Sequence, residues 1–152
     1  MSIEHFAYEL EQVWSGDAWY ASSLSDTLNG VTESEANARP IPSAHTIHES
    51  VRHIAVWLDV ARKRLQGVAY EPANDDEDWP PTESQSWQAS LDELDRAQAE
   101  LVAAIRSAKD ALLDTAAAGK TYTIRHMLFG VAQHNAYHQA QIALVKKAVR
   151  TR

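Results

Sequence analysis

The stretch TIHESVRHIAVWLDVARKRLQG, from Thr46 to Gly67, decides the fold class of this chain. Thr46 and Glu49 match the T-x-x-E capping box, in which each side chain accepts a hydrogen bond from the other residue's backbone at a helix start. Gly67 stands where a glycine commonly ends a helix. This stretch therefore predicts a helix of about 20 residues with one apolar face. The face consists of Ile47, Val51, Ile54, Leu58, Ala61 and Leu65.

A second long helix is predicted beyond an acidic segment that contains prolines. Thr82 and Gln85 match another capping box and are expected to open it. Its apolar stripe begins at Trp87 and continues to Leu112 at alternating spacings of three and four residues, which is typical of bundle packing. The acidic residues from Glu71 to Asp78 are expected to form a solvated loop rather than a cover over a site.

A third long helix is predicted from Thr123 almost to the C-terminus. Gly130 lies inside it, where glycine costs up to about 1 kcal/mol against alanine. We expect another backbone to approach closely at that point.

The N-terminal segment has a weaker pattern. One apolar stripe runs from Ile3 to Trp14 and resumes between Ala21 and Leu28, so a kinked helix and a short helix plus a longer one both fit. Thr32 and Glu35 form a further capping box, and Pro40 limits it to one or two turns. No segment alternates like a strand, so we predict an all-α, four-helix bundle in a single domain over residues 1–152.

Composition excludes several classes of function. The net charge is −7, and the 14 lysines and arginines are scattered, so nucleic acid and anionic membrane surfaces are poor partners. The chain has no cysteine, which excludes disulfides and thiolate ligands. We find no signal peptide and no apolar run of about 18 residues, so we expect a cytoplasmic protein.

Two histidines of the last predicted helix are candidate metal ligands. His134 and His138 lie four residues apart on one face, so both imidazoles reach one ion, and His138 falls on the apolar stripe itself. A pair of hydrogen-bonded core histidines explains the same spacing. Two ligands alone do not make a site, so a third must come from another helix.

The helix that begins at Thr46 offers that third ligand. His48, Glu49 and His53 look like the zinc-protease pattern H-E-x-x-H, but the histidines are five residues apart and point in different directions. His53 borders the apolar stripe and is the better ligand, whereas His48 is expected to face solvent. A di-iron carboxylate site is excluded because no glutamate stands three residues before a histidine.

The other histidines and the tryptophans have ordinary explanations. His5, His45 and His126 fall near expected helix or loop ends, where exposed or capping histidines are common. Trp14, Trp19, Trp57 and Trp79 either line a pocket or pack in the core, and we expect core packing for most of them.

The chain resembles the DinB-like superfamily (DNA-damage-inducible, YfiT-like) of metal-binding four-helix bundles. The resemblance rests on HTIHESVRHIAVWLDVARKRLQG, then DWP, then FGVAQHNAYHQAQIALVKKA, preceded by GDAWYASSLSDTLNGVTESEANARP. These pieces occur in order over nearly the whole chain. Related sequences tend to have tryptophan where His48 stands, which is either a neutral replacement or an added polar group at the mouth of a site.

The resemblance implies a bundle with long crossover connections and a metal site formed by His53, His134 and His138. It implies a divalent ion, zinc or nickel, and a homodimer. The best understood members are thiol-dependent transferases that use a low-molecular-weight thiol and act on a small-molecule substrate. Others are hydrolases by assignment only or have no assigned activity.

Two classes of function therefore compete. In the first, the chain is an enzyme in which the ion activates a thiol or water, for transfer or for hydrolysis. In the second, it is a non-catalytic module for metal binding or assembly. Glu49 is a weak candidate for a general acid or base, since its place in the capping box already explains it.

Overall fold

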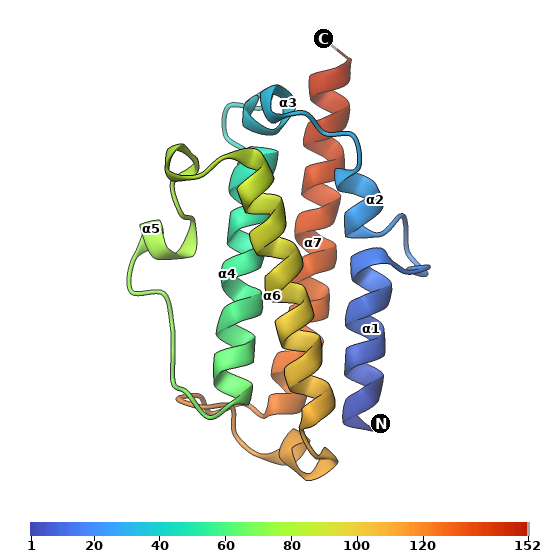
Figure 1. Cartoon of the computed structure of the whole chain (residues 1–152), viewed down its shortest axis with the longest axis vertical. Coiled ribbons are helices and arrows are strands. Elements are labelled where there is room, and N and C mark those ends of the chain that lie inside the picture. The colour runs from blue at the N-terminus through green and yellow to red at the C-terminus, as the bar shows by residue number, and fades with distance from the viewer. Residues whose placement is uncertain (152) are drawn as a thin grey trace.

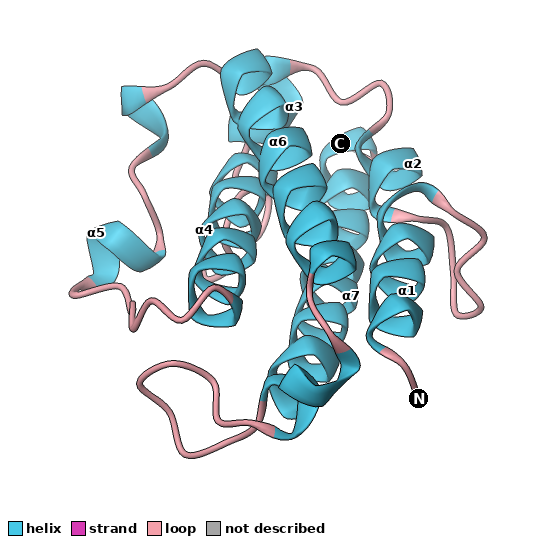
Figure 2. Cartoon of the chain, turned by 60° about the horizontal axis from the view of Figure 1, so that its bottom comes forward, coloured by secondary structure: helices cyan, strands magenta, loops and turns pink. Residues whose placement is uncertain are grey.

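The computed structural model describes residues 1–151, which are helical apart from their connections (Figure 2). No strand occurs in this range, and the one isolated bridge pairs Ala116 with Thr123. The fold is all-α, as predicted. The helices are α1 (Ile3–Ser15), α2 (Leu24–Leu28), α3 (Glu33–Asn37), α4 (Ile47–Leu65), α5 (Asp75–Asp78), α6 (Trp87–Ser107) and α7 (Ile124–Arg150), with 3₁₀ helices at Thr82–Ser84 and Asp110–Asp114.

The bundle consists of α1, α4, α6 and α7. Followed by colour in Figure 1, α1 and α7 run upward whereas α4 and α6 run downward. The neighbours α4 and α6 are thus parallel, and the chain must return along the outside of α4 to connect them. This crossover carries α5, while α2 and α3 lie on the path from α1 to α4. The predicted bundle with long crossovers is confirmed.

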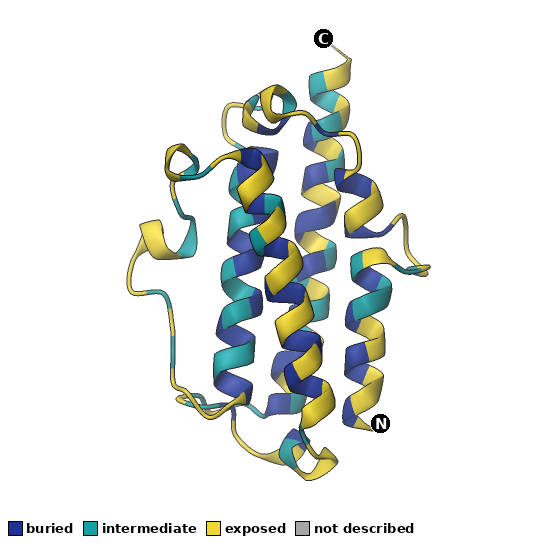
Figure 3. Ribbon diagram, in the orientation of Figure 1, coloured by how far each residue is buried: buried dark blue, intermediate teal, exposed yellow. Residues whose placement is uncertain are grey.

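Each long helix directs its apolar stripe to one shared core. Figure 3 shows buried and exposed turns alternating along α1, α4 and α6. In α4 the residues Ile47, Ile54 and Leu58 are fully buried, as the stripe predicted. In α6 the fully buried residues are Leu94, Leu101 and Ile105. None of the helices in residues 1–151 combines the length and the apolar character needed to cross a lipid bilayer.

Two of the three predicted capping boxes are present. Thr46 and Glu49 form both reciprocal hydrogen bonds at the start of α4, and Thr32 and Glu35 do the same at α3. Gly67 follows α4 with a φ of 86°, a left-handed conformation that favours glycine.

The predicted bounds of α6 were wrong at both ends. Gln85 donates to Glu93 instead of returning to Thr82, and α6 begins later, after Ser86, whose side chain accepts from the Ala89 backbone. The helix also ends at Ser107, before Leu112.

The early end of α6 and the open N-terminal pattern have structural explanations. Beyond α6, the 3₁₀ turn brings the Asp110 carboxylate to the Ile3 backbone N–H at 2.8 Å, where it caps α1. The N-terminal segment is two helices, the long α1 and the short α2, rather than one kinked helix.

The prediction for Gly130 was also wrong. A Cβ atom added there would meet no heavy atom within 4 Å, so no backbone approaches it closely. Gly130 instead lines a cavity between α4 and α7.

Candidate metal centre

Three imidazoles from α4 and α7 meet inside the bundle. His53 comes from the middle of α4, and His134 and His138 come from successive turns of α7. One ligand nitrogen from each residue can be chosen so that all three lie within 4.8 Å of one another. The structure thus brings together the three residues that the sequence singled out as ligands.

The spacing of the nitrogens fits a single ion. Nε2 of His53 lies 3.0 Å from Nε2 of His134. Two nitrogen ligands of a tetrahedral zinc ion lie about 3.3 Å apart, given bond lengths of about 2.05 Å. Nδ1 of His134 is buried without a hydrogen-bond partner, so no protein acceptor fixes the tautomer of this ring.

Hydrogen bonds fix the tautomers of the other two rings. Nδ1 of His53 donates to the backbone carbonyl of Asp78 at 2.8 Å, and Nδ1 of His138 donates to Oε1 of Gln141 at 2.8 Å. Since a neutral imidazole carries one proton, both residues present an Nε2 lone pair. Partners of this kind orient histidine ligands and raise their basicity.

Electrostatics keep all three rings neutral. Burial, aided by the neighbouring imidazoles, lowers the pKa of His134 to about 4. Burial, aided by His53, also lowers the pKa of His138 to about 4. The pKa of His53 is lowered mainly by burial, while Asp78 opposes the shift. At neutral pH the lone pairs are therefore available to a cation, as metal binding requires.

The crossover packs directly on the histidines. The Trp79 ring stacks on His53 with centroids 3.8 Å apart and on His45 with centroids 3.5 Å apart, so it lies between two imidazoles. Asp78 accepts from Nε1 of Trp57 at 2.7 Å and lies 3.2 Å from Nδ1 of His53. The crossover, through Asp78 and Trp79, thus sets the position of His53.

A family model described as the DinB superfamily matches residues 19–142. The chain belongs to the DinB superfamily. The match spans most of the chain and includes all three clustered histidines. A comparison with curated proteins finds no significant match.

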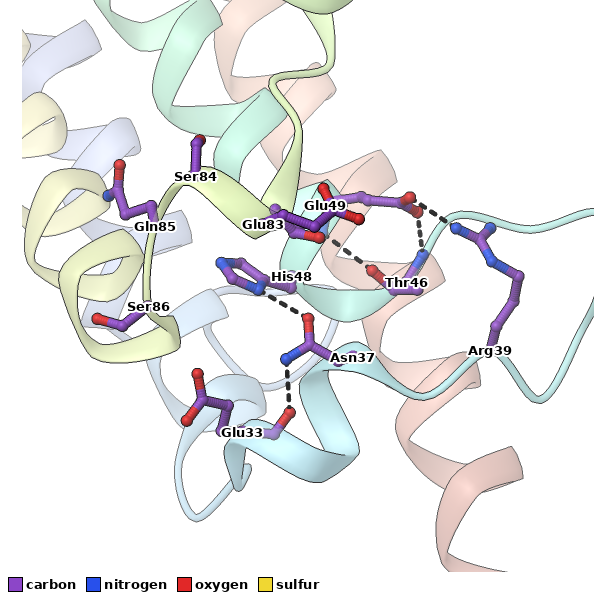
Figure 4. A pocket seen from close by; sticks show the side chains of 11 residues that line it. Glu33, Asn37, Arg39, Thr46, His48, Glu49, Glu83, Ser84, Gln85 and Ser86 are labelled. Atoms are coloured by element: carbon purple, nitrogen blue, oxygen red, sulfur yellow. Dashed lines mark hydrogen bonds and ion pairs between the residues drawn. The ribbon is translucent and has the colours of Figure 1, made fainter.

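His48, the alternative ligand of the DinB motif on α4, was placed wrongly by the sequence. It does not face solvent: only 1% of its surface is exposed. Its Nδ1 donates to Asn37 at 2.9 Å, and its Nε2 accepts from the Ser90 hydroxyl at 2.8 Å (Figure 4). His48 therefore ties α4 to α3 and α6, and it stands apart from the three-histidine cluster.

The remaining candidates lie elsewhere in this DinB bundle. Glu49 caps α4 and pairs with Arg39 at 2.6 Å, beside His48 in the pocket of Figure 4. His5 is paired with Glu9 on the surface of α1. His126 is exposed near the start of α7.

Sequence reasoning missed three positioning residues of the DinB site. Asp78 and Trp79 belong to the D-W-P piece, and Gln141 to the H-x-x-Q-I piece, so the motif marked them without giving their role. The expectation of core packing was wrong for Trp57 and Trp79, which border the histidines. It was also wrong for Trp19, which is fully exposed.

The prediction for the acidic crossover is confirmed for most of its length. The residues before Asp78 are almost all exposed, as expected of a solvated loop. Asp78 itself departs from the prediction because it contacts His53 and Trp57.

Proposed function

We propose that this chain is a metal-dependent enzyme, a thiol-dependent transferase that acts on a small electrophilic substrate. A zinc or nickel ion held by His53, His134 and His138 would supply a Lewis acid that lowers the pKa of a bound thiol. One observation carries the proposal: three neutral imidazoles converge on one point, two of them with their lone pairs fixed by Asp78 and Gln141.

The surroundings of the cluster support an enzyme over a storage or assembly site. His134 lies in the wall of a cavity of about 260 Å³ between α4 and α7, which has room for a small molecule. Trp79 covers His53 on another side and limits the access of water. The protein has no cysteine, so the thiol must come from solution as a low-molecular-weight co-substrate.

No residue of the cluster is proposed as a general acid or base. Glu49, the sequence candidate, is held by Thr46 and Arg39 at the start of α4. Thiol transfer at a Lewis acid has less need of such a group than hydrolysis, since the bound thiol loses its proton readily. This difference favours the transferase over the metal-dependent hydrolase, the second candidate.

The test is a conjugation assay with protein of measured metal content. Zinc-loaded or nickel-loaded protein is incubated with glutathione, cysteine or coenzyme A and 1-chloro-2,4-dinitrobenzene, beside ester and amide hydrolysis assays. We expect conjugation that needs both metal and thiol, that is lost in His53→Ala and His138→Ala, and that persists in the matched surface control His5→Ala.

The other outcomes assign the alternatives. Hydrolysis without thiol would identify a metal-dependent hydrolase. Inactivity in every assay with one ion bound per chain would identify a non-catalytic metal-binding module. The homodimer implied by the family stays a prediction, which analytical ultracentrifugation measures.

A further inference from the structure

The cavity beside His134 has an apolar body. It runs between α4 and α7, and Val60, Met127 and Val131 are among its lining residues. The two helices are antiparallel, so Trp57 lies in the wall at the same end as His134; their ring centroids are 6.0 Å apart. A ligand in this cavity therefore meets hydrocarbon along its length and the histidine cluster at one end.

The opposite end of the cavity is cationic. Arg64 lines it, two helical turns beyond Trp57, and only 3% of its surface is exposed. Nε of Arg64 donates to the Tyr70 carbonyl at 2.9 Å, and Nη1 donates to the Tyr122 hydroxyl at 2.8 Å. Nη2 is buried and makes no hydrogen bond. A buried guanidinium nitrogen without an acceptor is unfavourable, so the site lacks an anionic partner.

The protein's own carboxylate does not fill this role. Glu71 is the ion-pair partner of Arg64, but its oxygen lies 3.7 Å from Nη2, beyond hydrogen-bond distance. Glu71 is mostly exposed and is bound to Lys120 at 2.6 Å. Its charge is therefore largely engaged at the surface.

Tyr122 adds a second donor at this end. Its oxygen accepts from Arg64, and no acceptor within the described residues takes its own proton. Arg64 and Tyr122 together thus offer only donors and one positive charge, which matches the planar oxygens of a carboxylate.

The length of the cavity limits the size of its ligand. His126 and His134 both line it and are eight residues apart on α7, a rise of about 12 Å. Gly130 lies midway, where the missing side chain leaves open space.

We infer that this cavity binds a small, mostly apolar carboxylic acid, with its carboxylate on Arg64 and Tyr122 and its other end beside His134. The inference rests on the proposed function for what happens at that end. The carboxylate contacts themselves do not involve an ion.

The test measures binding of 4-phenylbutyrate and of its neutral analogue 4-phenylbutyramide by calorimetry, in zinc-loaded and in chelated protein. We expect the acid to bind in both forms and the amide to bind about tenfold more weakly or less, as the loss of a charge-assisted hydrogen bond implies.

Variants locate the carboxylate. Arg64→Met should weaken binding of the acid about tenfold or more and leave the amide little changed. Tyr122→Phe removes one hydroxyl, so it keeps the inference testable if Arg64→Met fails to fold, and it should weaken the acid severalfold. Arg62→Met removes the same charge from α4 at a residue that faces Asp59 and Glu100, and it should change nothing.

Three results would overturn the inference: equal binding of acid and amide, binding of neither, or binding of the acid only with zinc and unaffected by Arg64→Met. The last result would place the carboxylate on the ion. A chain that takes up no ion but binds the acid through Arg64 would instead refute the proposed function and leave the carboxylate site standing.

Discussion

His48 and His53 are both buried in α4, five residues apart, and their surroundings differ in one respect. His48 has both ring nitrogens hydrogen-bonded, to Asn37 and to Ser90. His53 donates one N–H to the Asp78 carbonyl, and its other nitrogen faces His134.

Neither burial nor acidity separates the two residues. Both are at most 5% exposed, and burial is the largest cause that lowers each pKa. The number of nitrogens that the protein itself satisfies does separate them. An imidazole bonded on both sides has no lone pair left for a cation, whereas His53 keeps one. On one helix, the same residue type thus serves as a tie between helices and as a candidate ligand.

Removal of each histidine in turn should produce the largest difference. We expect His53→Ala to weaken metal binding by more than about a hundredfold, because loss of a ligand exceeds the effect of losing its hydrogen-bond partner. His48→Ala should keep close to one ion per chain. The measurement is metal content and affinity in protein purified without an affinity tag. If His48→Ala loses the ion and His53→Ala keeps it, the assignment is reversed.

The stability of chelated protein should depend on pH through the clustered rings. The pKa of His134 is about 4 in the folded chain, against an ordinary value of 6.5. The unfolded chain thus binds a proton that the folded chain rejects, so this stability is complete above pH 6.5 and is lost as the pH falls toward 4. The loss should reach about 3 kcal/mol. Urea unfolding of the chain and of His134→Gln gives this contribution as a difference; identical pH profiles would contradict it.

His48→Ala should destabilise the fold more than it changes the site. It leaves Asn37 and Ser90 without a buried partner and opens a small cavity, at a cost of about 2 kcal/mol in the free energy of unfolding. His5→Ala, at an exposed position paired only with Glu9, should change it by less than about 0.5 kcal/mol. Equal effects in urea unfolding would remove the role of His48 as a tie.

The smallest effects should come from the partners of the two histidines. Asp78→Ala keeps the backbone acceptor but removes the carboxylate 3.2 Å from His53, so metal affinity should fall about tenfold. Asn37→Ala should lower stability by about 1 kcal/mol and leave metal affinity unchanged. Titration calorimetry and urea unfolding of both variants complete the exchange; a larger loss of metal affinity in Asn37→Ala would contradict it.

Local signals in the sequence predicted most of the fold. The capping boxes at Thr46 and Thr32 form because their side chains meet no competing partner. The same pattern failed at Thr82 because Gln85 hydrogen-bonds to Glu93 on α6 instead. A capping pattern thus predicts a helix start only when nothing outside the segment competes for its side chains.

The candidate site was predictable where one helix determines direction. Spacing separated His53 from His48, and it placed His134 and His138 on one face. It could not show that His48 is buried, because Asn37 and Ser90 come from other helices, 11 and 42 residues away. The same limit applies to Asp78, whose contact with His53 depends on the path of the crossover.

The sequence distance between the clustered histidines also determines when the site forms during synthesis. His53 and His134 are 81 residues apart, and α7 is the last helix to leave the ribosome. A nascent chain that ends before α7 holds only His53, and α7 alone offers only two imidazoles. Three-ligand ion binding therefore begins only after α7 has docked on α4, and an ion that needs all three ligands selects completed chains over partly made ones.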